Sequence, residues 1–443
     1  MKSTAPQGPL MLFIEFKNIF IIQIFVIGVF ILIYGEIQAA YLEMEPSLGW
    51  DIYYEDNIAG VSQNAPGKIG GFSNRYKPDL KFTMELPNCS INGKISQNVY
   101  RYFSERQWDR TDKSYIVNSL VKLSHRSELN LSASYTVNSN PDQFFTTEQG
   151  VQGGVIVRNF PIETKFYSAG YAYNLSPKNS LQFMFGYITF ISQFSSGSAI
   201  YIYSLTESFD LNKKDKIKLM VGYNSLEFNY PSFDPSNPDS FFNYKLDTYS
   251  INGGLVHQFD ESFKLEFSLG LSYSETKFNR AVFATDPNTG EIIITGTEPA
   301  TSNTSDPNFL FLLDKKYYHT TFQFRGQENL FTDPQTGQTY PSLNIGFLVT
   351  HDFSNKLNAT VSSTYYRNKA SAGDFNNRIE YDRTSYYLAL TLNYTYNKNL
   401  SMSLGYTNTV SKNNNVSTSN DKTMINNIFL RFTFTLKRPF IVG

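Results

Sequence analysis

Strict alternation of apolar and polar side chains is the feature that most constrains the fold of this chain. In segment 263–273, Phe, Leu and Tyr occupy the odd positions, and Lys, Glu, Ser and Gly occupy the even ones. Segments 129–135, 386–396 and 400–406 follow the same rule. Successive side chains of a β-strand point to opposite faces, so the alternation predicts strands with one apolar and one polar face. No sustained helical spacing occurs after residue 40.

The length of these segments narrows the class of all-β protein. Strands of soluble proteins average roughly five or six residues, whereas a strand that crosses a membrane needs about nine to eleven. In lipid, only helices and closed barrels satisfy every backbone hydrogen bond. The sequence therefore predicts an all-β, transmembrane, antiparallel up-and-down β-barrel. The alternative, a long soluble β-solenoid, would require a short fixed repeat, and none is evident.

The connections between strands predict the topology. Tight polar turns are expected at 87–88, 124–127, 176–178, 212–215, 260–261, 314–316, 354–355 and 397–399. Longer polar connections lie between them, including 57–71, 104–112, 138–160, 192–198 and 229–243. Membrane barrels show this asymmetry, with short periplasmic turns and longer extracellular loops. Eight short turns predict about 18 strands. If 309–324 is a folded loop instead, the barrel has 16.

A barrel of this size has a water-filled lumen, and its two faces can be assigned from the alternation. The polar face carries Ser, Thr, Asn, Gly and scattered charges of both signs, so ion preference is open. The candidate pore-lining residues are Asp51, Lys81, Glu85, Lys94, Lys122, Lys218, Lys264, Glu266 and Arg431. The opposite face carries many of the 38 Phe and 31 Tyr, as expected for lipid contact and for aromatic girdles. The candidate lipid-facing or girdle residues are Phe185, Tyr187, Tyr223, Leu269, Tyr273, Tyr394, Tyr406, Phe432 and Phe434.

The first forty residues form a separate unit. An apolar run at 20–34 follows Lys17 and precedes Ala39 and Ala40. This order of a basic, an apolar and a small-residue region predicts a secretory signal peptide over 1–40. An uncleaved N-terminal anchor is the alternative. Residues 41–443 then form the barrel, exported to the outer membrane.

Catalysis, cofactors and nucleic acid are not expected. The net charge of −1 lacks the basic footprint of a nucleic-acid binder. Cys89 is the single cysteine, so no internal disulfide or cysteine-based metal site is expected. His125, His257 and His351 lie at or beside predicted turns, and only His319 is expected on a strand. No nucleophile can be assigned to it, and the sequence predicts no enzyme activity.

The first and last strands each carry a resemblance to known outer-membrane barrels. Segment 48–57, LGWDIYYEDN, resembles the first strand of the beta-barrel porin 2 family. These are Gram-negative outer-membrane barrels that are often linked to exopolysaccharide export. Segment 427–440, NIFLRFTFTLKRPF, is similar to the last-strand signal read by the barrel-insertion machinery, although the tail 441–443 extends beyond it. The resemblance implies outer-membrane lipid and the insertion machinery as partners, and a pore or export role.

Three functions remain open at this stage. The first is a porin-like channel for small solutes. The second is the exit of an envelope system, such as exopolysaccharide export, or the barrel shell of a porin-cytochrome electron conduit with a periplasmic partner. The third is a surface receptor or an outer-membrane hydrolase. Segment 142–160, with its glycines around Val155, could constrict the lumen, or it could form an ordinary surface loop.

Overall fold

The computed structural model describes residues 40–58, 69–138, 162–192, 195–231, 241–285, 292–332, 339–370, 381–413, 422–436 and 438–442. The elements are strands apart from one short 3-10 helix, η1 (Arg106–Trp108). The strands are β1 (Ala40–Glu55), β2 (Gly71–Leu86), β3 (Cys89–Tyr102), β4 (Arg110–Ser124), β5 (Ser127–Asn138), β6 (Ile162–Ser176), β7 (Asn179–Ser192), β8 (Ser195–Asp210), β9 (Asp215–Pro231), β10 (Phe241–Asp260), β11 (Phe263–Thr285), β12 (Ile292–Tyr317), β13 (Thr320–Thr332), β14 (Thr339–Asp352), β15 (Leu357–Ala370), β16 (Tyr381–Asn397), β17 (Leu400–Asn413), β18 (Lys422–Thr435) and β19 (Arg438–Val442). Within these ranges no helix is long and apolar enough to cross a membrane.

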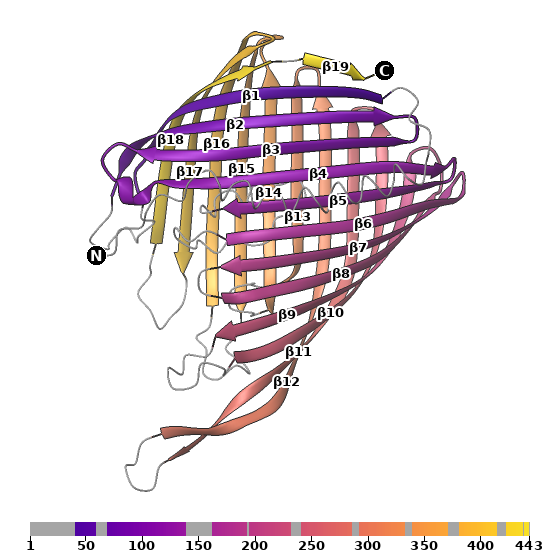
Figure 1. Cartoon of the computed structure of the whole chain (residues 1–443). Coiled ribbons are helices and arrows are strands. Elements are labelled where there is room, and N and C mark those ends of the chain that lie inside the picture. The colour runs from indigo at the N-terminus through magenta and orange to yellow at the C-terminus, as the bar shows by residue number, and fades with distance from the viewer. Residues whose placement is uncertain are drawn as a thin grey trace.

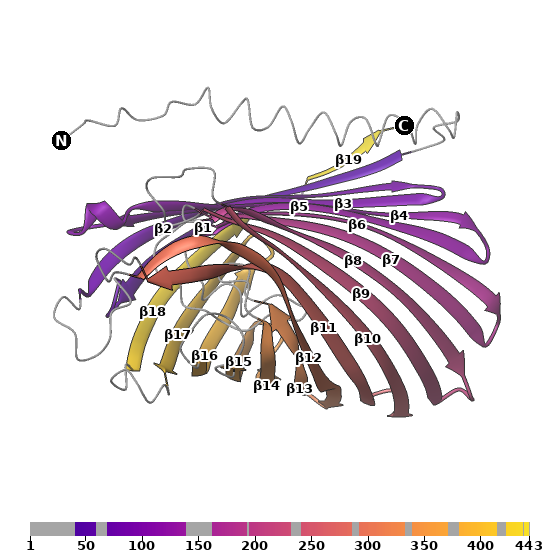
Figure 2. The same ribbon diagram turned by 90° about the horizontal axis from the view of Figure 1, so that it is seen from below.

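The strands form one closed antiparallel wall. From β1 to β18, each strand pairs with the next one in the sequence, and β18 pairs back with β1 (Figures 1 and 2). The short β19 continues β18 along the same edge, because Ser47 lies opposite Thr435 and Met44 lies opposite Arg438 in a single register. Counting β18 and β19 as one closing strand, the barrel has 18 strands. The predicted fold class is confirmed, and the alternative of 16 strands is wrong because 309–324 belongs to β12 and β13.

Short connections gather at one end of the barrel, here called the short-turn end; at the other end, called the long-loop end, the connections are longer except for the one between β7 and β8. Polar side chains close several of these turns by accepting backbone hydrogen bonds. Asn397 Oδ1 accepts from the N–H groups of Asn399 at 2.8 Å and Leu400 at 2.9 Å. Asp260 Oδ1 accepts from the N–H of Ser262 at 2.7 Å. The Asn and Asp signals that predicted these turns therefore act through the expected contacts.

Two predicted connections are wrong. The turn expected at 314–316 lies at 318–319, since β12 continues to Tyr317. Tyr318 adopts a positive φ of 48° there. Gly or Asn usually signals this conformation, and neither residue is present at this turn. The longer connection expected at 192–198 is also wrong, because β8 begins at Ser195.

Strands β11 and β12 extend beyond their neighbours at the long-loop end (Figure 1). They stay paired with each other as far as Thr285 and Ile292. Pairing of β11 with β10 ends at Lys277, and pairing of β12 with β13 ends at Phe309. The 18-strand wall therefore carries a projecting two-stranded ribbon at this end.

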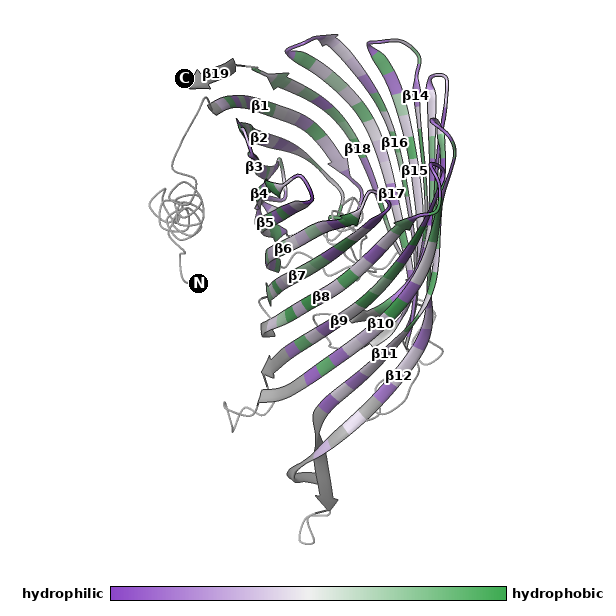
Figure 3. Ribbon diagram, turned by 90° about the vertical axis from the view of Figure 1, so that its right-hand side faces the viewer, coloured by the Kyte–Doolittle hydropathy of each residue, from purple (hydrophilic) through white to green (hydrophobic). Residues whose placement is uncertain are grey.

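The wall has little conventional core. Figure 3 shows hydrophobic and hydrophilic residues alternating along the strands, as the sequence pattern predicted. A small buried cluster of Ile58, Tyr100 and Tyr102, with Ile69 and Trp108 against it, lies toward the long-loop end of β1 to β4. Elsewhere the exposed apolar side chains stand mostly on the outer face. The lumen face carries some buried apolar residues, such as Leu226, Leu246 and Val256, together with the candidate site.

Candidate functional site

The cross-strand register identifies the two faces of the wall, because residues directly opposite each other in a sheet share a face. On β11, Leu269 and Leu271 are 56% and 64% exposed, whereas Ser272 and Ser274 are buried. The exposed apolar set has the character of a lipid-facing surface, so the alternate set faces the lumen. On every neighbouring strand around the ring, the residues paired with outer-face positions also face outward, and the alternate residues face the lumen.

This register places the predicted residues as follows. The candidate pore-lining residues share the lumen face: Asp51, Lys81, Glu85, Lys94, Lys122, Lys218, Lys264, Glu266 and Arg431. The candidate girdle residues share the outer face: Phe185, Tyr187, Tyr223, Leu269, Tyr273, Tyr394, Tyr406, Phe432 and Phe434. On that outer face Tyr223 packs against Tyr249, with ring centroids 5.1 Å apart. The predicted loop segment 142–160 lies outside the described residues.

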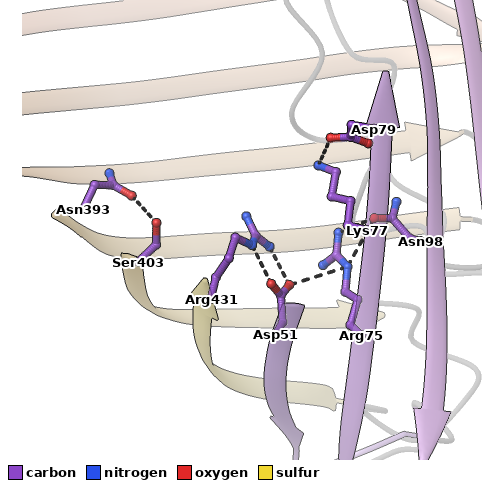
Figure 4. A network of polar contacts seen from close by, with 8 residues as sticks. All are labelled: Asp51, Arg75, Lys77, Asp79, Asn98, Asn393, Ser403 and Arg431. Carbon is purple, nitrogen blue, oxygen red and sulfur yellow. Dashed lines mark hydrogen bonds and ion pairs between the residues drawn. The ribbon is translucent and has the colours of Figure 1, made fainter. Parts of the chain in front are cut away.

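The most connected polar group on the lumen face straddles the seam between the first and last strands. Arg431 of β18 donates from Nε to Asp51 Oδ1 at 2.7 Å and from Nη2 to Oδ2 at 2.8 Å. Arg75 of β2 places its Nε 3.7 Å from Asp51 Oδ2 (Figure 4). The Asp51 side chain is 0% exposed. Such bidentate arginine–carboxylate pairs are among the stronger protein hydrogen bonds, so this group fixes the closure of the barrel.

The network continues along β2 and β3. Asn98 Oδ1 accepts from Arg75 Nη2 at 3.0 Å, and Lys77 Nζ lies 3.8 Å from Asp79 Oδ2 (Figure 4). The predicted lumen residues did not include Arg75, Lys77, Asp79 or Asn98. Asp79, Lys77 and Arg75 follow at every second position from Lys81 toward the start of β2. The alternation that selected Lys81 therefore also predicts these three residues on the lumen face.

The pairing leaves part of the positive charge uncompensated. Lys81 and Lys94 lie directly opposite each other on the lumen face. Asp51 and Asp79 are already engaged by other cations, and neither lysine has a carboxylate within ion-pair distance in the described part of the chain. Glu45 is the opposite neighbour of Lys81 on β1. Like charges directly opposite each other repel, so this point of the wall concentrates positive charge on the lumen face.

A second charged group lies near the short-turn end. Glu266 of β11 accepts a hydrogen bond from Lys218 of β9 at 2.6 Å and lies 3.6 Å from Lys264. Three predicted lumen residues therefore form one group.

Between the charged groups the lumen is lined by amides and hydroxyls that satisfy one another. Asn393 Oδ1 accepts from Ser403 Oγ at 2.7 Å (Figure 4), and Asn118 Oδ1 accepts from Ser132 Oγ at 2.7 Å. Polar groups of this kind cannot form a dry core without cost. The lumen face is therefore suited to contact with water and hydrophilic solutes.

The histidines do not assemble a catalytic group on the lumen face. His319 lies in the turn at 318–319 and not on a strand, which corrects the prediction for it. His257 Nδ1 lies 2.5 Å from Asp215 Oδ1, and both belong to the outer face at the short-turn end. His351 Nδ1 contacts Thr320 Oγ1 at 2.7 Å on the same face. Among the described residues, no three His, Cys, Asp or Glu side chains are grouped closely enough to hold a metal.

Comparison with known proteins finds similar structures but no matching family. No protein family model matches the chain, and no curated protein matches it. The resemblance to the beta-barrel porin 2 family therefore stays a prediction.

The solved structures similar to this chain include outer-membrane proteins. OccK9 (OpdG) of Pseudomonas aeruginosa has a TM-score of 0.45 and 11% identity, covering 90% of this chain and 98% of that one. OpdK of Pseudomonas aeruginosa has a TM-score of 0.42 and 11% identity, covering 89% and 99%. OccAB4 of Acinetobacter baumannii has a TM-score of 0.42 and 12% identity, covering 90% and 99%. The architecture described above rests on the strand pairing of this chain itself.

Proposed function

We propose that the barrel is an outer-membrane pore for small hydrophilic solutes, with its short-turn end in the periplasm. The observation that carries the proposal is a closed 18-strand wall whose lumen face is polar and whose outer face is apolar. Barrels of about eight strands are filled by their own side chains, whereas sixteen to eighteen strands leave an aqueous channel. A wall of this size lined by amides, hydroxyls and charges supports diffusion of water-soluble molecules.

The outer face supports the membrane location. On β11 the outward residues from Phe263 to Tyr273 are all apolar or aromatic, and the first outward charge is Glu275. This span agrees with the roughly nine to eleven residues of a tilted transmembrane strand. Membrane barrels place short turns in the periplasm and longer loops outside, which gives the proposed orientation.

Single-channel recording tests the proposal directly. Full-length purified barrel added to a planar lipid bilayer in potassium chloride should produce discrete conductance steps. Liposomes containing the barrel should swell in isotonic solutions of small sugars and not in large dextrans. Barrel that is folded, as judged by circular dichroism and resistance to heat in detergent, but does not conduct would refute a pore.

Export and insertion complete the proposed route to the membrane. Residues 1–40, which include the predicted signal peptide, lie outside the described residues apart from Ala40. We expect secretion across the inner membrane, removal of this segment and delivery of the closing strand to the barrel-insertion machinery. Fractionation of cells that express the full chain should place it in the outer membrane.

Exopolysaccharide exit is a second candidate function, favoured by the resemblance of segment 48–57 to the beta-barrel porin 2 family. In that case deletion of the gene should leave polymer in the periplasm, and glycosyltransferase genes should lie nearby. Normal secretion of polymer in the deletion strain, with lost uptake of small solutes, would favour the simple diffusion pore.

A further inference from the structure

We propose that the periplasmic mouth of the lumen carries a binding site for a small polyvalent anion, such as a phosphate ester or a polycarboxylate. The site is a cavity of about 350 Å³ between the turn at 125–126, the turn at 177–178 and the adjoining ends of β8 and β9. Small-molecule sites occupy concave spaces of about this size. The proposal names a solute class for the proposed pore, but binding does not require that the barrel conducts.

Four residues of the cavity lining lie on the lumen-facing side of their strands. They are Asn174, Ser180, Asp210 and Lys216. The register pairs Asn174 with Ser180 and Asp210 with Lys216. A solute that enters or leaves at this end of the pore therefore passes the cavity.

Backbone hydrogen bonds hold the two turns in fixed positions. The carbonyl oxygen of Arg126 accepts from the N–H of Asn174 at 2.8 Å, and the carbonyl oxygen of Lys178 accepts from the N–H of Asp210 at 2.7 Å. Each turn is thereby anchored to the following hairpin. Since neighbouring strands are about 4.8 Å apart, turns of successive hairpins lie roughly 10 Å from each other. The two basic side chains can reach one bound molecule from opposite sides.

The charge of the cavity is positive. Arg126 and Lys178 have no carboxylate within ion-pair distance in the described ranges, whereas Lys216 is engaged by Asp210 at 3.3 Å. His125 adds a further nitrogen donor or acceptor to the lining. With Asp210 already paired, the arginine and lysine leave two positive charges facing the same space. Guanidinium and ammonium groups recognise phosphate and carboxylate oxygens, which identifies the ligand as an anion with more than one charge.

Equilibrium binding tests the site without reference to conductance. Titration of citrate or inorganic phosphate into the detergent-solubilised full-length barrel, followed by isothermal calorimetry, should show millimolar binding. The double variant Arg126→Gln/Lys178→Gln should bind about tenfold more weakly, since it removes both unpaired positive charges of the cavity. The matched control is Lys356→Gln/Lys398→Gln, which removes the same charge from two other turns at the same end of the barrel. Absence of binding to the unmodified barrel, or equal weakening in both double variants, would overturn the proposal.

Side-specific block of the pore gives a second test. In oriented bilayers, citrate added on the short-turn side should reduce chloride current, and citrate on the long-loop side should do so less. The block should disappear in Arg126→Gln/Lys178→Gln and persist in Lys356→Gln/Lys398→Gln. A barrel that does not conduct would refute the pore while the calorimetric result still decided the site. Equal block from both sides would contradict a site at this mouth.

Discussion

Replacing Leu269 by Arg is the sharpest test of the two-faced wall. Leu269 stands on the outer face of β11, 56% exposed, close to the middle of the outward run from Phe263 to Tyr273. Its cross-strand neighbours are Gly253 on β10 and Phe309 on β12. Neither neighbour is a carboxylate, so nothing nearby offsets a buried guanidinium. Arginine at the bilayer midplane of a barrel costs about 2–4 kcal/mol. The folding equilibrium constant should therefore fall roughly 30-fold to 1,000-fold.

Ser268→Arg is the matched control, because Ser268 neighbours Leu269 but lies on the lumen face, where its side chain meets water. Substitutions on solvated surfaces usually change stability by less than about 0.5 kcal/mol. Both variants can be compared by reversible urea unfolding in lipid vesicles, followed by the fluorescence of Trp50 and Trp108, of which Trp50 lies on the outer face. Leu269→Arg should lower the unfolding midpoint clearly, and Ser268→Arg should leave it nearly unchanged. Equal destabilisation by both substitutions, or a larger loss for Ser268→Arg, would refute the face assignment.

Three further predictions use the same preparation. Asp51→Asn should destabilise the barrel by about 3–5 kcal/mol, because Arg431 and Arg75 then face each other without a carboxylate. Urea unfolding measures the loss. The control is Ser403→Ala, which removes a single hydrogen bond worth about 1 kcal/mol. Lys81→Gln/Lys94→Gln should move the reversal potential in a potassium chloride gradient toward cation preference, whereas Lys218→Gln should move it less; no difference between them would contradict the uncompensated lysine pair. Mass spectrometry of barrel purified from outer membranes should show a chain beginning after Ala40, and a retained residue 1 would contradict the signal peptide.

Local alternation was sufficient to predict much of the fold. Segment 263–273 specified one apolar and one polar face, and the structure forms β11 over it. The number of strands followed from turns built on Asn, Asp and Ser, whose side chains accept the backbone N–H groups of their own turns. These contacts span two or three residues, so they are visible in the sequence.

The wrong turn at 314–316 has a physical cause. The stretch 314–316 is polar and resembled a turn, but the alternation continues through it to Tyr317. Lys315 lies at the end of the membrane wall, where its Nζ sits 4.9 Å from the ring of Phe263 and 3.6 Å from Asp260. A lysine can cover apolar surface with its stem while its charge reaches polar groups, so it does not mark a turn. Tyr318 then makes the turn without Gly or Asn.

The sequence by itself determined the two faces of each strand, because that property depends only on whether a position is odd or even. It also predicted that the chain forms one wall, since alternation appears almost everywhere after residue 40. The tertiary structure alone decided which lumen charges are neutralised. Asp51 and Arg431 are separated by 380 positions in the chain, yet closure of the ring places them in direct contact. The predicted lumen residues carry charges of both signs, so the sequence alone indicated no preference for anions or cations. Pairing across the seam engages Asp51 and leaves Lys81 opposite Lys94, because electrostatic compensation depends on distance in space and not on order in the chain.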